Sequence, residues 1–584
     1  MAEDPIDIYF NHMRYDTVAS ESDDRIIIAL DFGSTFSGIA YAFCNSEKKP
    51  ELNPILDWPG LEGHRQPKVP TLICYDAHDS TKFTWGGQVD WRSDAVQGVK
   101  LLLDPDQPKP DYIPDRKMKS ELKKLPKDPV DIAADFIGAI YKHAVAKIES
   151  SGVKDYVEFC HKQFVLSVPA VWSDKAKDRT LRAAKKAGIH PVVLIKEPEA
   201  AALYTLHLHK RAMNVGDAFL VCDAGGGTVD LITYEVTNLS PALELVEVVP
   251  GSGGMAGSLV LNNRFTERVR NLVGDKQWEL LKKSIGWSKA LNEWDKFVKR
   301  AFQGDPEEEY YVTFPQAKLE DDPEQGLADN CWTMPGEEVQ AIFDPLVRDI
   351  LRLIDEQVEK ALLKRQREPL KGIFLVGGFG SSQYLKSCIE RAVPNVQVIQ
   401  PDDAWAAIVK GAVLSRIPQQ ATVTSTQAVR HYGVSAWCVF EPVTDQGRPT
   451  KYFPESGSTR VQRNTWYIYA GEDLKRDKKI KFRFYTAVDV NNHETKDFIF
   501  WDNLLSSDNT LAPTYPGNDT RVNCTLKTDL THVHKSRFKT KRGVDGRNYY
   551  RVEYDLVIST TAANMKFSFE IDGEEMGSVE ATYE

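Results

Sequence analysis

The sequence predicts an α/β fold followed by an all-β region, and two features of the chain indicate this. Between Ile26 and about Arg416, short apolar runs such as IIIAL (26–30) and FLVC (219–222) alternate with amphipathic helical segments. Apolar runs without polar alternation suit strands that are covered on both faces, as in α/β sheets. After residue 427 the segments alternate and are rich in aromatic and β-branched residues, for example KIKFRFYTAV (479–488), which is typical of an all-β domain.

Four parts follow one another along the chain. Residues 1–24 are polar and are predicted to form a flexible arm, and residues 25–416 hold the α/β domain. The segment IPQQATVTSTQ (417–427) is polar and lacks periodicity, so it is interpreted as a linker. Residues 428–584 form the predicted β-rich domain, and no long helical segment follows its strands, so we expect no helical lid.

Helices are predicted between the strands of the α/β domain. One begins at Ser173, a favourable N-cap residue, and ends at Gly188, which suits the position after a helix. Another is the amphipathic segment AADFIGAIYKHAVAKIES (133–150).

Composition excludes several classes of protein. The 584 residues carry a net charge of −11, which argues against nucleic-acid binding; the basic stretch HVHKSRFKTKR (532–542) is interpreted as a solvated hairpin face. The eight cysteines are scattered, so neither a disulfide scaffold nor a zinc site is expected. The N-terminal segment lacks the apolar core of a secretory signal, and no stretch approaches the ~18 apolar residues of a membrane span. We therefore expect a cytoplasmic protein that binds neither nucleic acid nor membranes.

Two segments share the plan strand, aspartate, glycine-containing turn, strand. IIIALDFGSTFSGIAYAF (26–43) contains Asp31, and FLVCDAGGGTVDLITYEV (219–236) contains Asp223. Because an apolar run follows at once, each predicts a β-hairpin; the spacing also differs from the Walker phosphate loop. Glycine turns let backbone N–H groups approach an anion closely. A single hairpin of this kind could be an ordinary tight turn, but two matching ones predict a polyphosphate gripped from two sides.

The residues around these turns suit a magnesium-bound polyphosphate. Ser34, Thr35 and Thr228 can add hydroxyl donors to the backbone donors. Asp31 and Asp223 lie at the strand ends and would hold Mg²⁺ through water, because this ion prefers oxygen ligands and keeps several waters.

Two other segments add to the predicted site. In GIFLVGGFGSSQYLKSCI (372–389) a strand runs into a glycine pair before a helix, which is a usual place for a nucleotide, although close helix–strand packing also uses such glycines. In VVLIKEPEAAALYTL (192–206), Pro198 disfavours helix at Glu197 and suits the first helical turn. Glu197 is thereby placed at a strand-to-helix corner, where its carboxylate can enter a cleft; a solvated or capping glutamate is the alternative.

These four segments, in this order, resemble the nucleotide-binding domain of the 70-kDa heat-shock chaperone family, within the wider group of actin-like ATPases. FVLSVPAVWSDKAKDRTLRAAKKAGIHPVVLIKEPEAAAL (164–203) is specifically chaperone-like, and GSGGMAGSLV (251–260) indicates a divergent branch. The resemblance covers about residues 26–416. It implies two lobes with ribonuclease-H-like sheets and ATP in the cleft between them.

The resemblance also implies roles for individual residues. Glu197 would orient the attacking water with Asp230 nearby, Lys100 would be the catalytic lysine, and Asp31 and Asp223 would hold the metal. A solvated helix lysine is the alternative for Lys100. The residues that would contact ATP are Gly33, Ser34, Thr35, Phe36, Gly225, Gly226, Gly227, Thr228, Gly253, Gly254, Lys299, Arg300, Gly377, Gly378, Phe379 and Asp402.

Several departures from the family pattern affect the functional prediction. Phe36 replaces a usual tyrosine, Phe379 replaces a small polar residue, and the acidic linker with its leucine run is missing. The resemblance predicts slow Mg²⁺-dependent ATP hydrolysis that gates a β domain binding a polypeptide or protein partner, with a nucleotide-exchange or co-chaperone partner. The alternative is a non-hydrolysing, nucleotide-gated interaction or scaffold protein. A sugar-type kinase would need an aspartate base beside a sugar pocket, which no segment supplies convincingly.

Overall fold

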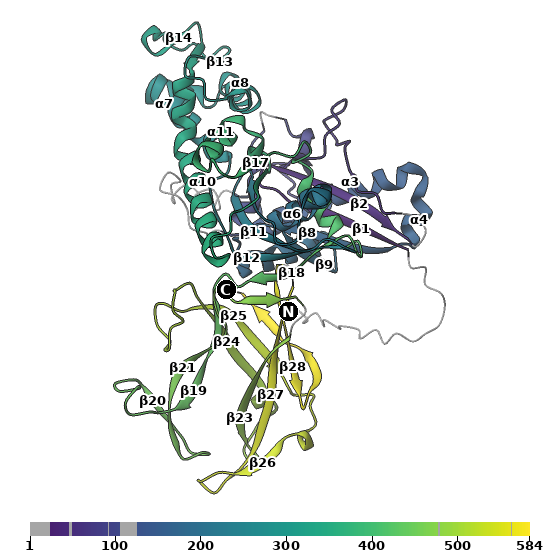
Figure 1. The fold of residues 1–584 in the computed structure, drawn as a ribbon, viewed down its shortest axis with the longest axis vertical. Coiled ribbons are helices and arrows are strands. Elements are labelled where there is room, and N and C mark those ends of the chain that lie inside the picture. The colour runs from purple at the N-terminus through teal and green to yellow at the C-terminus, as the bar shows by residue number, and fades with distance from the viewer. Residues whose placement is uncertain are drawn as a thin grey trace.

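The computed structural model describes residues 24–45, 49–90, 93–104, 125–476, 479–561 and 563–583. The predicted flexible arm, apart from Asp24, lies outside the described residues. Figure 1 shows helices and sheets packed together in the part that runs from purple to green, and an elongated all-β part in green to yellow beneath it. A mixed α/β part followed by an all-β part agrees with the prediction, whereas the division of the α/β part into two lobes stays a prediction.

Two mixed sheets carry the α/β part. The first contains, in spatial order, β3 (Asn53–Pro54), β2 (Phe36–Cys44), β1 (Arg25–Asp31), β8 (His161–Val168) and β9 (Val192–Lys196), with β4 (Val69–Pro70) also paired to β2. The second contains β17 (Gln397–Ile399), β16 (Gly372–Val376), β10 (Ala218–Ala224), β11 (Val229–Asn238), β12 (Leu243–Gly254), β18 (Ala421–Gln427) and β22 (Asp473–Lys475). In each sheet an antiparallel hairpin, β1–β2 or β10–β11, lies next to a parallel strand, β8 or β16.

Helices cover the faces of both sheets. They are α1 (Val99–Leu102), α3 (Pro129–Ile148), α4 (Lys154–Phe159), α5 (Asp174–Lys186), α6 (Glu197–His209), α7 (Leu259–Leu281), α8 (Ile285–Glu293), α9 (Lys299–Ala301), α10 (Gly336–Lys364), α11 (Gln383–Ala392) and α12 (Ala407–Leu414). The predicted start of α5 is confirmed, because Ser173 Oγ accepts a hydrogen bond from the backbone N–H of Ala176. Gly188 follows this helix with a φ of 83°, a conformation that glycine adopts without strain.

The apolar runs of the central strands are covered on both faces, as predicted. In β10, Leu220 packs with α7 and α10, and Val221 packs with α6 and α12. In β1, Ile28 packs with α3 and α5, and Ala29 packs with α6 and α12. Since neighbouring residues of a strand point to opposite faces, α6 and α12 form a layer between the two sheets. This layer fixes how the two hairpins face each other.

The α/β part also contains two small sheets. One contains β6 (Phe83–Trp85), β5 (Leu72–Tyr75) and β7 (Val96–Gln97), and another contains β13 (Glu309–Thr313), β15 (Cys331–Pro335) and β14 (Leu327–Ala328).

The all-β part has two sheets. One contains β20 (Thr450–Phe453), β21 (Ser458–Ile468), β19 (His431–Val439), β24 (Ile499–Ser507), β25 (Arg521–Asp529) and β30 (Glu580–Thr582). The other contains β23 (Lys479–Asp489), β27 (Asn548–Thr560), β28 (Met565–Ile571) and β29 (Glu574–Ser578), with β26 (Lys539–Arg542) paired to β27. Side chains from both, such as Leu504 and Leu556, share one apolar core, as in a β-sandwich.

Part of the segment predicted as a linker is a strand. Residues 421–427 form β18, which pairs parallel to β12 and antiparallel to β22. The sequence ATVTSTQ is polar, but threonine is β-branched and suits a half-buried strand. The chain therefore leaves the α/β part through strands that extend its second sheet.

The two parts also meet through half-buried charged and polar side chains. Tyr432 of β19 donates a hydrogen bond to Asp174 of α5 at 3.0 Å. Burial alone would raise the pKa of Asp174, but the charges of Lys177 and Arg430 and this hydrogen bond outweigh burial and hold the pKa below its usual value. The ionised carboxylate therefore stabilises the contact between α5 and the all-β part.

This contact should weaken in acid. An acid whose folded pKa lies below the unfolded value of 3.8 stabilises the fold above that pH, and this stability is lost as the pH falls through the folded pKa. We expect Asp174→Asn to lower the thermal-unfolding midpoint at neutral pH and to flatten its decline below pH 3.8. Asp178→Asn on the same helix is the control, because the pKa of Asp178 is raised by burial. Equal pH profiles for wild type and Asp174→Asn would contradict the prediction.

Candidate functional site

The turn of the first hairpin is closed by hydrogen bonds and leaves no room for a side chain. The backbone N–H of Gly33 donates to Ser37 Oγ at 3.1 Å, and Ser37 Oγ lies 2.8 Å from Thr71 Oγ1. A Cβ atom on Gly33 would overlap the carbonyl oxygen of Phe36. The tight turn after Asp31 therefore requires glycine.

The second hairpin places Asp223 opposite Asp230 in its register. The backbone N–H of Gly225 donates to the carbonyl of Thr228 at 2.9 Å and closes the turn. The carbonyls of this turn accept hydrogen bonds from the segment 257–259, at 3.1 Å to Gly225, 2.8 Å to Gly226 and 3.2 Å to Gly227. This segment, which holds the carbonyl side of the turn, was not among the predicted site residues.

The turns of the two hairpins contact each other. A Cβ atom on Gly226 would overlap Thr35 Oγ1, and one on Gly227 would overlap Ser34 Oγ. Glycine at these positions therefore allows the backbone of the second turn to approach the hydroxyl groups of the first turn.

A cluster of buried, interacting charges includes the aspartates of the strands that lead into the turns. Its four carboxylates and two ammonium groups belong to Asp31, Asp223, Asp230, Glu197, Lys68 and Lys100. Lys68 Nζ lies 2.6 Å from Asp31 Oδ2, and Ser167 Oγ donates to Asp31 Oδ1 at 2.7 Å. Lys100 forms an ion pair with Glu197 and lies 5.6 Å above the ring of Trp172. The cluster thus contains more acids than bases.

The acids of the cluster differ in their affinity for protons. Burial raises the pKa of Glu197 despite its ion pair with Lys100. Burial and the charge of Asp230 raise the pKa of Asp223 to about 7. At Asp31, in contrast, the charges of Lys68 and Lys100 outweigh burial and lower the pKa. Asp31 is therefore ionised at neutral pH, whereas the raised pKa values of Glu197, Asp223 and Asp230 favour the uptake of protons or of further positive charge.

Glu197 and Lys100 are not solvated side chains. Glu197 is 7% exposed and Lys100 is 2% exposed. Pro198 occupies the first turn of α6, as predicted, but Glu197 is itself the first helical residue, and the extended residue before the helix is Lys196. The alternative of a solvated side chain therefore does not hold for either residue, while their catalytic roles stay predictions.

Lys68 is a member of the cluster that sequence reasoning missed. It lies in QPKVPT (66–71), next to the short strand β4 that pairs with β2. A lysine beside an apolar strand residue is commonly solvated, so the local pattern gives little indication of its burial. Its ion pair with Asp31 depends on the approach of two segments that are separated along the chain.

The predicted glycines elsewhere in the site flank the second hairpin. Gly253 of β12 lies opposite Asp230, and Gly254 lies opposite Val229. Gly377 follows β16 with a φ of 85°, and a Cβ atom there would overlap Asp223 Oδ1.

The residues predicted to contact adenosine have varied surroundings. Gly378 is exposed and borders open space. Lys299 Nζ lies 3.2 Å from Asn262 Oδ1 and forms an ion pair with Asp295, and Arg300 is exposed. Their contact with adenosine stays a prediction.

Three further residues were predicted to contact ATP, namely Phe36 in the first hairpin, and Phe379 and Asp402 beside adenosine. Phe379 is buried against Phe343, with ring centres 6.1 Å apart, and Phe36 packs edge-on to Trp405 at 5.4 Å. Asp402 is exposed. For Phe36, Phe379 and Asp402 the predicted contact with ATP likewise stays a prediction.

The described residues contain no group of three or more His, Cys, Asp or Glu side chains arranged to bind a metal directly. Within the same residues, every helix is too short or too polar to span a bilayer.

Comparison with known proteins identifies relatives over most of the chain. Human heat shock 70 kDa protein 12A is 24% identical over 91% of this chain and 90% of its own length. Human heat shock 70 kDa protein 12B is 23% identical over 67% of this chain and 68% of its own length. The chaperone protein HscA of Pectobacterium carotovorum subsp. carotovorum (strain PC1) is 27% identical over 41% of this chain and 37% of its length. A family model described as a domain of unknown function (DUF8340) matches residues 213–399.

The fold and the paired acid–glycine hairpins, together with these relatives, place the chain in a class of protein. The chain is similar to the heat shock 70 kDa proteins over most of its length, and to HscA over part of it. More particularly, it is similar to heat shock 70 kDa protein 12A over most of its length, at 24% identity, which marks a distant relationship.

Proposed function

We propose that the chain binds ATP with Mg²⁺ where the two hairpin turns meet, and that slow hydrolysis of this ATP gates the all-β part. One observation carries the proposal: four buried carboxylates interact with only two buried ammonium groups, and two of the carboxylates, Asp31 and Asp223, lie in the strands that lead into the two glycine turns. Such a cluster is stabilised by a further cation, and the turns supply the close backbone approach that a polyphosphate needs. The relationship to heat shock 70 kDa proteins supports a nucleotide-binding protein.

The side chains at this point fit a magnesium-bound polyphosphate. Asp31 and Asp223 would hold the ion through water, consistent with the lack of a direct metal-binding group among the described residues. Asp230 Oδ2 is buried without a hydrogen-bond partner in the part of the chain that the structure describes, so it can accept from a bound water. Because Thr35 contacts Gly226, the turns must separate to admit the phosphates.

Hydrolysis of a phosphoanhydride needs an oriented water and neutralised phosphate charge. Lys68 and Lys100 are buried and supply positive charge, which is effective because few waters screen it there. Glu197 is the first residue of α6, directly after β9, and would orient the water. When bound, Mg²⁺ would add to the neutralisation of the phosphates.

Gating is supported by the way the chain leaves the α/β part. The hairpin β10–β11 belongs to the sheet that continues through β12 and β18 to β22. Arg476, just after β22, lies 2.6 Å from the fully buried Glu199, two residues beyond Glu197 on α6. If the two hairpin turns move apart, this movement would therefore be transmitted along the sheet to the first strands of the all-β part. A polypeptide or protein partner would bind there. A nucleotide-exchange or co-chaperone partner would act on the same equilibrium.

Calorimetric titration with ATP tests the binding step. We expect the wild type to bind ATP more tightly with Mg²⁺ than without it. In Asp223→Asn the ratio of these two affinities should fall about tenfold or more, which corresponds to a loss of about 1.4 kcal/mol of binding free energy or more. Asp502→Asn is the control, because Asp502 is half-buried and also has a pKa raised by burial, but belongs to the all-β part. ATP binding that ignores Mg²⁺, or no binding at all, would contradict the proposal.

A second candidate is a nucleotide-gated interaction or scaffold protein that does not hydrolyse ATP. The ion pair between Glu197 and Lys100 favours this second candidate, because a carboxylate that is paired with a lysine is less able to orient a water molecule. In this case ATP binding and its dependence on Mg²⁺ would remain, but phosphate would not be released.

A further inference from the structure

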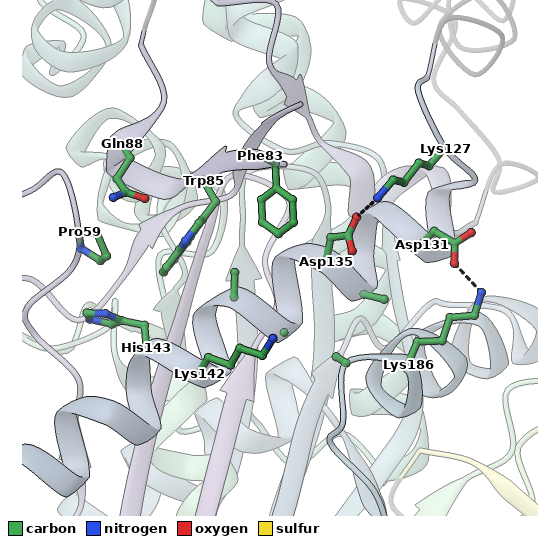
Figure 2. A pocket seen from close by; sticks show the side chains of 14 residues that line it. Pro59, Phe83, Trp85, Gln88, Lys127, Asp131, Asp135, Lys142, His143 and Lys186 are labelled. Carbon is green, nitrogen blue, oxygen red and sulfur yellow. Dashed lines mark hydrogen bonds and ion pairs between the residues drawn. The ribbon is translucent and has the colours of Figure 1, made fainter. Parts of the chain in front are cut away.

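A cavity lies against α3 and shares no lining residue with the charged cluster. Its volume is about 870 Å³, which lies within the range of volumes that small-molecule binding sites have. Figure 2 shows it between α3, the segment around Phe83 and Trp85, and the end of α5 at Lys186.

Two aromatic rings and the small residues of α3 shape this cavity. Phe83 and Trp85 line one side, and Ala134, Gly138 and Ala139 line the helix side. Because these α3 residues have little or no side chain, a flat group can lie between the helix and the rings. Aromatic side chains favour such flat, polarizable groups in stacked or edge-on arrangements.

The aromatic side is held in place before any ligand arrives. The ring of Trp85 packs edge-on against Phe136 at 6.0 Å and against His143 at 6.1 Å. His143 Nε2 in turn lies 2.7 Å from the carbonyl oxygen of Asp57. Preorganisation of this kind lowers the entropic cost of binding.

The charges at the rim leave one ammonium group without a partner. Asp131 pairs with Lys186 at 2.5 Å, and Asp135 pairs with Lys127 at 2.7 Å. Asp131, Asp135 and Lys142 follow one another on one face of α3, but Lys142 has no carboxylate partner among the residues that the structure describes. In Figure 2 its side chain extends into the space below Phe83, and no dashed line reaches it.

We propose that this cavity binds a planar aromatic carboxylate, with the ring against Phe83 and Trp85 and the carboxylate at Lys142. A neutral ring would leave the charge of Lys142 uncompensated. A cationic ligand would meet three lysines against two aspartates that are already paired. The chemistry therefore favours a flat ligand with a single negative charge.

Calorimetric titration with 2-naphthoate, and with the neutral 2-naphthamide of the same shape, tests this proposal. We expect the wild type to bind 2-naphthoate about fivefold more tightly than the amide, as one partly exposed ion pair allows. Lys142→Met should abolish this difference and leave amide binding unchanged. Lys147→Met, which removes an exposed lysine of α3 outside the cavity, is the matched control.

A second variant tests the location independently of charge. Ala139→Trp places a large ring in the cavity and should abolish binding of both compounds, while an unchanged thermal-unfolding midpoint would show that the fold persists. Equal affinity for naphthoate and naphthamide would overturn the proposal. An effect of Lys147→Met as large as that of Lys142→Met, or no detectable binding at millimolar concentration, would also overturn it.

Discussion

Glu197→Ala should lower the rate of ATP hydrolysis in a single turnover by about a hundredfold or more, because a positioned carboxylate contributes about 10²–10⁴-fold to proton transfer and water activation. Glu197 is the carboxylate of the cluster that lies at a helix start and is paired with Lys100. Its burial raises its pKa, so it can exchange a proton near neutral pH. The measurement is phosphate release from ATP with enzyme in excess, so that product release does not limit the observed rate.

Glu247→Gln is the matched control for this experiment. Glu247 is also buried, has a raised pKa and forms an ion pair with a lysine, Lys196, at 2.9 Å, but it lies outside the charged cluster. Its replacement should change the hydrolysis rate far less than Glu197→Ala. If wild type and Glu197→Ala hydrolyse ATP equally slowly, the non-hydrolysing interaction protein becomes the correct interpretation.

Lys68→Met should lower the free energy of unfolding of the α/β part by about 3–5 kcal/mol, the usual effect of removing one partner of a buried ion pair. The Lys68 and Asp31 side chains are only 7% and 3% exposed, so the remaining carboxylate would be buried without its counterion. Denaturant unfolding followed by a probe in the α/β part measures this loss. The double variant Lys68→Met/Asp31→Asn should recover most of it, because residue 31 then carries no charge that lacks its counterion.

An exposed ion pair provides the comparison for Lys68. Lys282→Met removes the partner of Glu279 at the surface and should lower the free energy of unfolding far less than Lys68→Met does. If Lys68→Met lowers the free energy of unfolding equally little, or if the double variant is as unstable as the single one, the ion pair between Lys68 and Asp31 does not stabilise the fold as predicted.

The elements of the fold could be predicted because the residues that specify them are neighbours in the chain. The uninterrupted apolar runs around Ile28 and Val221 indicate strands covered on both faces, and such strands are observed. Ser173 caps α5 through a hydrogen bond three residues along the chain. The strand β18 was missed because its threonines give a polar composition while their branched side chains favour extended backbone.

The candidate site was predictable only in part, for the same reason. Asp31 and Asp223 stand at recognisable strand ends, and Pro198 places Glu197 at a corner. The pairing of Lys68 with Asp31 joins residues whose proximity no local pattern encodes.

The sequence by itself therefore determined the two acid–glycine hairpins, the corner at Glu197 and the change from α/β to all-β structure, because backbone geometry and hydrophobic periodicity are local properties. Only the tertiary structure decided which charges share one buried space, and that the turns at Thr35 and Gly226 contact each other. Burial and the charges of distant neighbours set the pKa of Asp223 and of Glu197, and both depend on how α6 and α12 hold the two sheets against each other.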